Sequence, residues 1–468
     1  MIVKQKIFLF SALALLIYFP FRVFADNTAT TSTSTITSLA TSTVPSLTPT
    51  TTPTGLQPSS TPITGLQIPP IPPIIEAINS AKAQLATVTL NHALTPVYKK
   101  NTKKILRYNL GSKDIALAIL DPATNNTIIT IGRLNGKSMV FPDPAVNVQL
   151  SSFNGVNSQF QVNTPTNGVV VALKYLISET DSGSKVAIEN GLSQVVYVPS
   201  SPALDTPDVV AYGQTYLEGV IQKVANDLFG LPSESVPGET ITQAIPPAMI
   251  ESLVYAEHTD TGEVLNGNVQ EALDSLNIIL ATNGPDAYKY SVSNDGYASR
   301  GIAQFIKSTY EGLVTRHPGA FLNPDYVAGM QDHENSIKAM YLLLDDDAGA
   351  VRAEAPNNFV ASRAFEYGAA SYNAGSSRVI KAVQNFGDLW DQDRSGQINA
   401  TQSQINSLKA QIKKASSKTR SSLNSQLATA EDQLATLKAG SLTNTTVNYL
   451  TKIYKVVPFF NQQQLAMN

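Results

Sequence analysis

The chain has 468 residues, of which 43% are hydrophobic, and it contains no cysteine. This length exceeds one ordinary domain, so we expect two folded regions joined by linkers. The formal net charge of −3 argues against a nucleic-acid-binding role, because it gives no overall basic excess. The absence of cysteine excludes disulfides, zinc–thiolate sites and thiol nucleophiles, so packing, helped at most by a metal held on oxygen ligands, must stabilise the folded regions.

The N-terminus has the layout of an export signal. Two lysines precede an apolar run from Ile7 to Phe19, and a compact stretch then leads to Ala25. We expect residues 1–25 to form a signal peptide that is cleaved after Ala25, which predicts a periplasmic, cell-envelope or extracellular protein. The alternative is an uncleaved anchor that tethers the chain to a membrane or envelope, although Pro20 interrupts the apolar run.

Residues 26–73 are dominated by threonine, serine and proline, with repeated pieces such as "TPTTTPTGLQ" and "TPITGLQIPP". Such a segment cannot bury enough apolar surface to offset the entropy lost on ordering, and its prolines favour extended conformations. We therefore expect a disordered Ser/Thr/Pro linker that acts as a stalk.

Residues 74–235 predict a small β-rich domain with flanking helices. Helical spacing begins at Ile74, directly after two prolines that suit a helix start. From Ile105 to Val198 the pattern changes to alternating β-branched runs separated by turn residues, and helical spacing returns up to Gly230. No titratable cluster stands out here, and we expect a structural domain, with a spacer or wall-binding role as the alternative.

Residues 243–457 have a helical pattern, with a helical hairpin inserted at residues 396–440. Two stretches of the hairpin place apolar residues at alternating steps of three and four, which is typical of helices that pack along one seam. Ser416 and Ser417 are expected near the turn. The hairpin is either an arm that contacts a partner or shapes a substrate groove, or a self-contained helical insertion.

The segment "IPPAMIESLVYAEHTDT" predicts an amphipathic helix with a carboxyl group on its apolar face. Glu257 follows Leu253 and Val254 at steps of four and three, so it points the same way as they do. Loss of hydration there raises a carboxyl pKa from about 4.3 toward the ~6 that suits a general acid. Glu251 lies on the more polar side of the helix, where we expect a solvated surface residue.

Three further segments follow in order: "YASRGIAQF" at 297–305, "GAASYNAGSSRV" at 368–379 and "TTVNYLTKIYKV" at 445–456. Together with the Glu257 helix they resemble the soluble lytic transglycosylase family of the goose-type lysozyme superfamily. The resemblance implies a mostly α, lysozyme-like catalytic domain over residues 243–457. Two departures from the family pattern are His258, where serine is usual, and Ala303, where methionine is usual.

The resemblance also implies an activity on peptidoglycan glycan strands. A lytic transglycosylase cleaves the β-1,4 bond between N-acetylmuramic acid and N-acetylglucosamine and leaves a 1,6-anhydro end, with no cofactor. Glu257 would act first as acid and then as base, and Tyr449 would orient or polarise it. Gln304 and Asn373 would donate hydrogen bonds to the sugar, and Tyr372 would pack beneath the groove or serve as a core aromatic residue.

Two alternatives remain open at this stage. The first is a hydrolysing muramidase of the same fold, for which Asp260 could supply a second carboxylate, although its position after the helix end favours solvated capping. The second is a catalytically silent cell-wall-binding protein, against which the presence of Glu257 and Asn373 argues. We interpret His258 as a residue at the rim of the site, because neighbours on a helix point apart.

The stretch "DQDRSGQINATQ", from Asp391 to Gln402, resembles an EF-hand-type calcium loop. Such a loop supplies oxygen ligands at its first, third, fifth and seventh positions and needs glycine at the sixth, where Gly396 lies. Gln402 replaces the usual final glutamate and should weaken binding. The alternatives are a structural calcium ion or an acidic turn that caps the hairpin. The four early ligand positions are Asp391, Asp393, Ser395 and Gln397.

Overall fold

The fold is mixed, mainly helical with a small antiparallel sheet region. The computed structural model describes residues 69–100, 103–135, 138–177, 185–186, 192–293 and 298–466, and all of these belong to one compact unit. The predicted export signal and the Ser/Thr/Pro-rich linker up to residue 68 lie outside the described residues, so both stay predictions.

The strands among the described residues all fall before residue 200, and all except β1 lie in the predicted range from Ile105 to Val198. They are β1 (His92–Tyr98), β2 (Ile105–Asp121), β3 (Asn126–Asn135), β4 (Ser138–Val140), β5 (Asn147–Ser152), β6 (Gln159–Thr164), β7 (Val169–Ile177), β8 (Lys185–Val186) and β9 (Ser193–Tyr197). The larger sheet has the order β4-β3-β2-β7-β9, and β1 and β8 also pair with β2. The pairings are antiparallel, and β5 and β6 form a separate hairpin.

The central strand β2 is buried on both faces. Side chains alternate along a strand, so Ile115 and Leu117 point to one face while Ala116 and Ala118 point to the other. The first pair joins a core closed by the β5–β6 hairpin, and the second joins a core shared with helix α1. Burial on both faces explains the nearly continuous apolar run in this strand.

Helices make up the remainder of the described chain. They are α1 (Pro73–Ala86), α2 (Pro207–Asp227), α3 (Ile241–Ala244), α4 (Pro247–His258), α5 (Thr261–Asn266), α6 (Val269–Asn283), α7 (Lys307–Arg316), α8 (Tyr326–Gln331), α9 (His333–Glu354), α10 (Ala364–Ala374), α11 (Ser376–Phe386), α12 (Ser395–Lys414), α13 (Ser417–Gly440) and α14 (Asn444–Ala466). Proline opens α1, α2 and α4, as expected of a residue that lacks the N–H a first helical turn leaves unused. None of the described helices is both long and apolar enough to cross a membrane.

Helices α2 and α6 join the sheet region to the helical region, so the expected boundary near residue 240 does not separate two independent cores. Val209 of α2 and Ile278 of α6 pack in the core shared with the sheet, whereas Leu217 of α2 packs in the large helical core. The two helices touch closely at Gly213, where an added Cβ would lie 1.9 Å from the carbonyl oxygen of Asn277. Only glycine fits at this contact.

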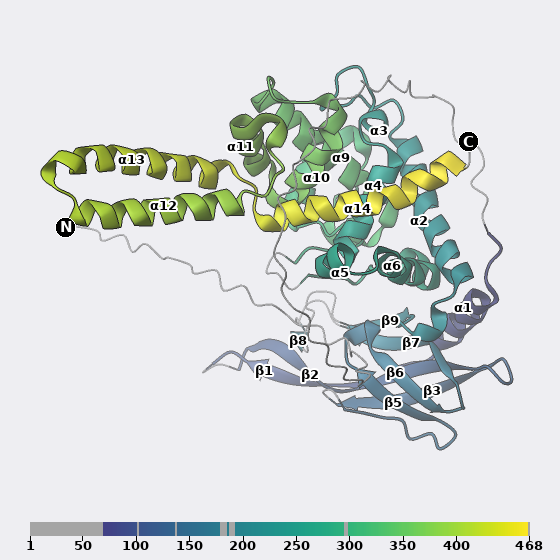
Figure 1. The fold of residues 1–468 in the computed structure, drawn as a ribbon. Helices are drawn as coiled ribbons and strands as arrows, with labels where there is room; N and C mark the ends of the chain where they lie inside the picture. The colour runs from purple at the N-terminus through teal and green to yellow at the C-terminus, as the bar shows by residue number, and fades with distance from the viewer. Residues whose placement is uncertain are drawn as a thin grey trace, which may run out of the picture. The chain divides into compact units, whose positions relative to one another are not determined.

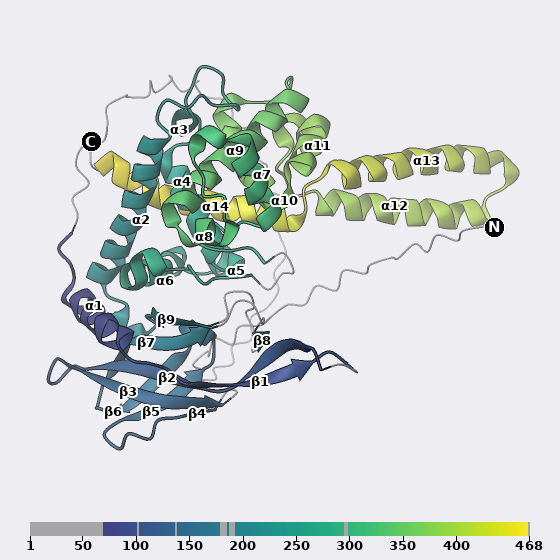
Figure 2. The same cartoon turned by 180° about the vertical axis from the view of Figure 1, so that it is seen from behind.

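The helical hairpin is formed by α12 and α13, which lie side by side (Figures 1 and 2). Its bounds and the turn at Ser416 agree with the prediction. Ile405 and Leu408 of α12 pack against Ala430 and Leu434 of α13 in a small core of their own. Helix α11 packs against α13 at the base, so the arm joins the helical core there.

Candidate active site

Glu257 lies in the last turn of α4, where the apolar face of the helix ends. Leu253 and Val254, one turn earlier, are fully buried, while Glu257 itself is only half-buried. Burial raises the pKa of Glu257 to about 6, and a hydrogen bond from Tyr449 and the charge of Lys452 oppose this rise. A carboxyl group with this pKa can both release and accept a proton near neutral pH.

Tyr449 belongs to α14, which packs against α4 (Figure 1). Its hydroxyl donates a hydrogen bond to Oε1 of Glu257, across 192 residues of sequence. The Tyr449 side chain is buried, and burial, followed by the charge of Glu257, raises its pKa well above the ordinary value, so the phenol keeps its proton. Tyr449 can therefore stabilise the carboxylate without competing for its role as acid.

Lys452 is a third member of this group, and we did not predict it. It lies one helical turn after Tyr449, and its ammonium group, nearly inaccessible to solvent, donates hydrogen bonds to the carbonyl oxygens of Ala256 (2.6 Å) and Thr259. Burial lowers the pKa of Lys452 to about 8, and the charge of Glu257 opposes that shift. Lys452 thus holds the end of α4 that carries Glu257, at the negative pole of the helix. The signal available in the sequence was its spacing of three from Tyr449.

Tyr372 connects two of the motif segments. Its hydroxyl donates a hydrogen bond to the carbonyl oxygen of Ala303, and its ring meets the edge of Phe305 at 5.5 Å between centroids. Burial, and then the charge of Glu257, raises the pKa of Tyr372 well above its ordinary value. The residue therefore lies within electrostatic reach of Glu257 and is half-buried, and its position beneath a substrate groove stays a prediction.

We expected Gln304 to point a free amide at a substrate, but its amide forms hydrogen bonds within its own loop. Its Nε2 group donates to the carbonyl oxygen of Gly301 (2.7 Å) and to Ser291 (3.3 Å), and its Oε1 accepts from Ser299 (3.1 Å). Gly301 has a φ of +72°, and a Cβ there would lie 2.1 Å from the carbonyl oxygen of Met330. Gln304 therefore ties down the loop of the second motif segment, and its predicted contact with the sugar stays a prediction.

Asn373 is exposed near the C-terminal end of α10, and its side chain has no hydrogen-bond partner among the described residues. Gly375 follows with a φ of +82°, so the chain turns sharply into α11. This geometry needs glycine and ends α10 directly after Asn373. An unpaired amide on the surface can bind a sugar hydroxyl or acetamide group, so the predicted role of Asn373 stays open.

His258 does not provide a second acid near neutral pH, and Asp260 caps a helix. The His258 ring stacks on Tyr288 at 3.8 Å, and its Nε2 donates to the carbonyl oxygen of Ile302 at 2.7 Å. Burial lowers the pKa of His258 to about 4, so the ring is neutral at pH 7. Asp260 is exposed and accepts a hydrogen bond from the N–H of Glu263 (2.9 Å), which confirms that it caps a helix, α5.

Glu251 is buried, so our prediction of a solvated residue was wrong. Its exposed fraction is 6%, and its Oε1 has no hydrogen-bond partner. Burial raises its pKa well above the ordinary value, and the nearby charge of Glu218 adds to the rise. The prediction failed because α4 is surrounded by α2, α6, α9 and α14, so its polar side also faces other helices.

The residues of the suggested calcium loop do not converge on one point. Asp391 accepts a hydrogen bond from Arg363 (2.7 Å), and Asp393 accepts from the N–H and the hydroxyl of Ser395. Helix α12 already begins at Ser395, so the carbonyl oxygen of Gln397 accepts a hydrogen bond within that helix. No group of three or more metal-binding side chains occurs among the described residues. Asp393 instead forms its hydrogen bonds with Ser395 at the start of α12, and calcium binding stays a prediction.

Comparisons with models of protein families, with curated proteins and with solved structures found no match to this chain.

Proposed function

We propose that the helical region is a lysozyme-like catalytic domain and that the protein is a peptidoglycan lytic transglycosylase. The observation that carries this proposal is the hydrogen bond from Tyr449 to Glu257, because it joins the first and the last of the four motif segments. A second contact, from Tyr372 to the carbonyl oxygen of Ala303, joins the two middle segments. The resemblance assigns functional residues to these same segments.

The chemistry needs one carboxyl group with a pKa near the working pH. In the first step the protonated Glu257 gives its proton to the glycosidic oxygen as the bond to the anomeric carbon breaks, and the acetamide group of the sugar assists at that carbon. In the second step the Glu257 carboxylate takes the proton from the C6 hydroxyl, whose oxygen closes on the anomeric carbon. The protons balance, no water is consumed, and a 1,6-anhydro end results.

The surroundings of Glu257 support both steps. Its pKa of about 6 leaves a large protonated fraction in mildly acidic solution. Once the proton has left, the Tyr449 hydroxyl and the Lys452 ammonium stabilise the carboxylate. Both groups are held on α14, so they need little rearrangement during the reaction.

A single-carboxylate reaction fits this site better than a hydrolytic reaction that uses Asp260. A retaining or inverting glycosidase needs a second carboxyl group aimed at the sugar. The Asp260 side chain instead accepts the Glu263 N–H at the start of α5. The muramidase alternative therefore loses the residue on which it depended.

Mass spectrometry of the products from purified peptidoglycan tests the proposal. Anhydro-ended fragments, lighter than reducing-end fragments by one water, are the expected result. Reducing ends would instead indicate a muramidase, and an absence of products would indicate a binding protein. The substrate lies outside the plasma membrane, so the proposed activity needs the export predicted from residues 1–25.

A further inference from the structure

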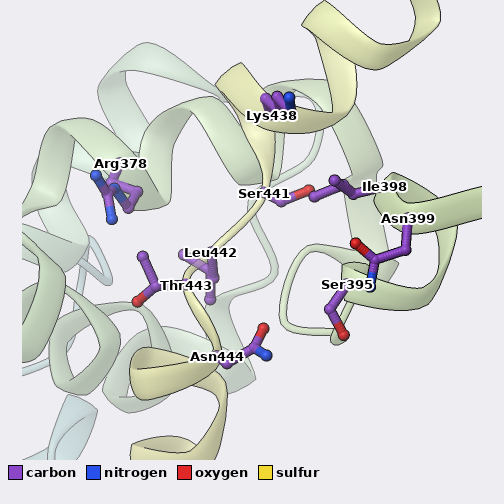
Figure 3. Close-up of a pocket in the computed structure, with 9 residues that line it drawn as sticks. All are labelled: Arg378, Ser395, Ile398, Asn399, Lys438, Ser441, Leu442, Thr443 and Asn444. Atoms are coloured by element: carbon purple, nitrogen blue, oxygen red, sulfur yellow. The ribbon is translucent and has the colours of Figure 1, made fainter. Parts of the chain in front are cut away.

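A pocket of about 300 Å³ with a mixed polar and apolar lining lies at the base of the helical hairpin. It is bounded by α11, α12, the end of α13 and the start of α14 (Figure 3). None of its lining residues carries a carboxylate. The polar and charged side chains that line it are Arg378, Ser395, Asn399, Lys438, Ser441, Thr443 and Asn444.

The pocket has a local excess of positive charge in a chain whose formal net charge is −3. Arg378 and Lys438 approach it from different helices (Figure 3). Neither forms an ion pair within the part of the chain that the structure describes, and the closest polar partner of the Lys438 Nζ is Oε1 of Gln402 at 3.5 Å. Two unpaired cations around one hollow favour an anionic ligand.

Helix N-termini add to this positive potential. Arg378 lies in the first turn of α11, Ser395 begins α12 and Asn444 begins α14. The Thr443 side chain accepts a hydrogen bond from the N–H of Thr446 (3.3 Å), whereas the N–H groups of Asn444 and Thr445 have no partner inside the helix. Free N–H groups and the positive end of the helix dipole both attract anions.

A buried hydroxyl in the pocket wall also lacks a partner. Ser441 is 9% exposed, and its Oγ has no hydrogen-bond partner. Figure 3 shows this hydroxyl on the side of Ile398, at the pocket wall. A buried hydroxyl without a partner is unfavourable, and an oxygen of a bound ligand would satisfy it.

The pocket flanks the candidate active site through two helices. Asn444 and Tyr449 are both on α14, separated by about 7.5 Å along the axis at 1.5 Å per residue. Arg378 follows Asn373 by five residues, across the turn at Gly375. The pocket and the candidate site are therefore built partly on the same two segments of the chain.

We propose that the pocket binds a carboxylate carried by the glycan strand, on the peptide attached to its lactyl groups or on the lactyl group itself. This inference rests on the proposed function and assigns a substrate-recognition role to the base of the hairpin. Arg378 and Lys438 supply the charge, and the Ser441 hydroxyl and the first N–H groups of α14 supply hydrogen bonds.

The test is the double variant Arg378→Gln, Lys438→Gln in the full chain. We expect KM for peptide-bearing strands to rise about tenfold with kcat unchanged, because lost ground-state binding raises KM alone. Strands stripped of peptide by an amidase keep only the lactyl carboxylate. The lactyl carboxyl is amide-bonded to the peptide in intact strands, so a KM increase confined to intact strands assigns the peptide carboxylate, and one confined to stripped strands assigns the lactyl carboxylate. An equal increase on both shows that the pocket accepts either carboxylate.

The matched control is Lys413→Gln, Lys418→Gln, which removes the same charge near the tip of the hairpin, where both lysines are exposed. An equal KM increase in this control, or no increase in the pocket variant, would overturn the proposal. Calorimetric titration separates this test from the proposed function, with a synthetic muramyl tripeptide for the peptide carboxylate and N-acetylmuramic acid for the lactyl carboxylate. If the wild type and the control release heat and the pocket variant does not, the result supports ligand binding in the pocket even if no strand is cleaved. No heat from the wild type with either ligand would overturn the proposal.

Discussion

Lys452→Met replaces the buried ammonium group with an apolar side chain of similar length. The carbonyl oxygens of Ala256 and Thr259 lose their donor, and each acceptor left unsatisfied is unfavourable by about 1–2 kcal/mol. The fall in the Lys452 pKa from 10.5 to about 8 corresponds to about 3 kcal/mol of unfavourable burial of charge, which the variant relieves. The two effects nearly cancel, so we expect the variant to fold with a free energy of unfolding within about 1 kcal/mol of the wild type.

The larger consequence of Lys452→Met is on the pH profile. The first step needs protonated Glu257, so kcat/KM should fall as pH rises through the Glu257 pKa of about 6. The Lys452 charge lowers that pKa, as does the Tyr449 hydroxyl, while the neighbouring Tyr372 is uncharged at these pH values. Without the ammonium group the pKa rises, so the alkaline limb should move to higher pH by up to about one unit.

The control for this prediction is Lys455→Met on the same helix. Lys455 is exposed and donates a hydrogen bond to the carbonyl oxygen of Leu265, so the substitution removes a similar contact away from Glu257. The assay is kcat/KM from pH 4 to 8 with peptidoglycan, alongside urea unfolding of each variant. An alkaline limb that stays in place or moves to lower pH in a folded Lys452→Met variant would refute the electrostatic reasoning.

Three further predictions concern the carboxyl groups of α4 and their partner. Glu257→Gln should raise the free energy of unfolding by roughly 1–2 kcal/mol at pH 7.5 but not below pH 4.5. The reason is that the folded-state pKa of Glu257 is raised to about 6, so the wild type loses stability as pH rises from 4.5 through 6. Urea unfolding of both proteins at the two pH values checks this. Tyr449→Phe should lower kcat by about 10²-fold while leaving the circular dichroism spectrum unchanged, and a kcat within a factor of three of the wild type would remove Tyr449 from the mechanism. Glu251→Gln should keep cleavage activity but reduce the loss of stability as pH rises above 4.5, because the buried Glu251 carboxyl also has a raised pKa. An unaltered dependence of stability on pH would contradict the burial of Glu251.

The sequence predicted the main elements of this fold because their patterns are local. Proline starts, apolar spacing and turn residues placed α1, α4 and both hairpin helices close to their observed bounds. The joining of the two regions was not predictable in the same way. It depends on α2 packing its two halves into different cores, and helical spacing alone does not say which core a residue enters.

For the candidate site, the sequence identified the residues that a motif carries and missed those that depend on tertiary packing. The pairing of Glu257 with Tyr449 followed from motif order, and the structure brings the two together. The burial of Glu251 and the carbonyl contacts of Lys452 depend on which helices surround α4. The hydrogen bonds of Gln304 within its own loop depend on the turn at Gly301, and the conformation of that turn could not be predicted from the motif.

The central claim is that Glu257 drives an intramolecular ring closure without consuming water. Digestion of purified peptidoglycan in ¹⁸O-labelled water, followed by mass spectrometry of the new ends, tests this most directly. We predict anhydro ends without the heavy isotope for the wild type and no new ends for Glu257→Gln, whose amide cannot donate the acid proton. Reducing ends that carry ¹⁸O, or turnover by Glu257→Gln above about a thousandth of the wild-type rate, would contradict the account.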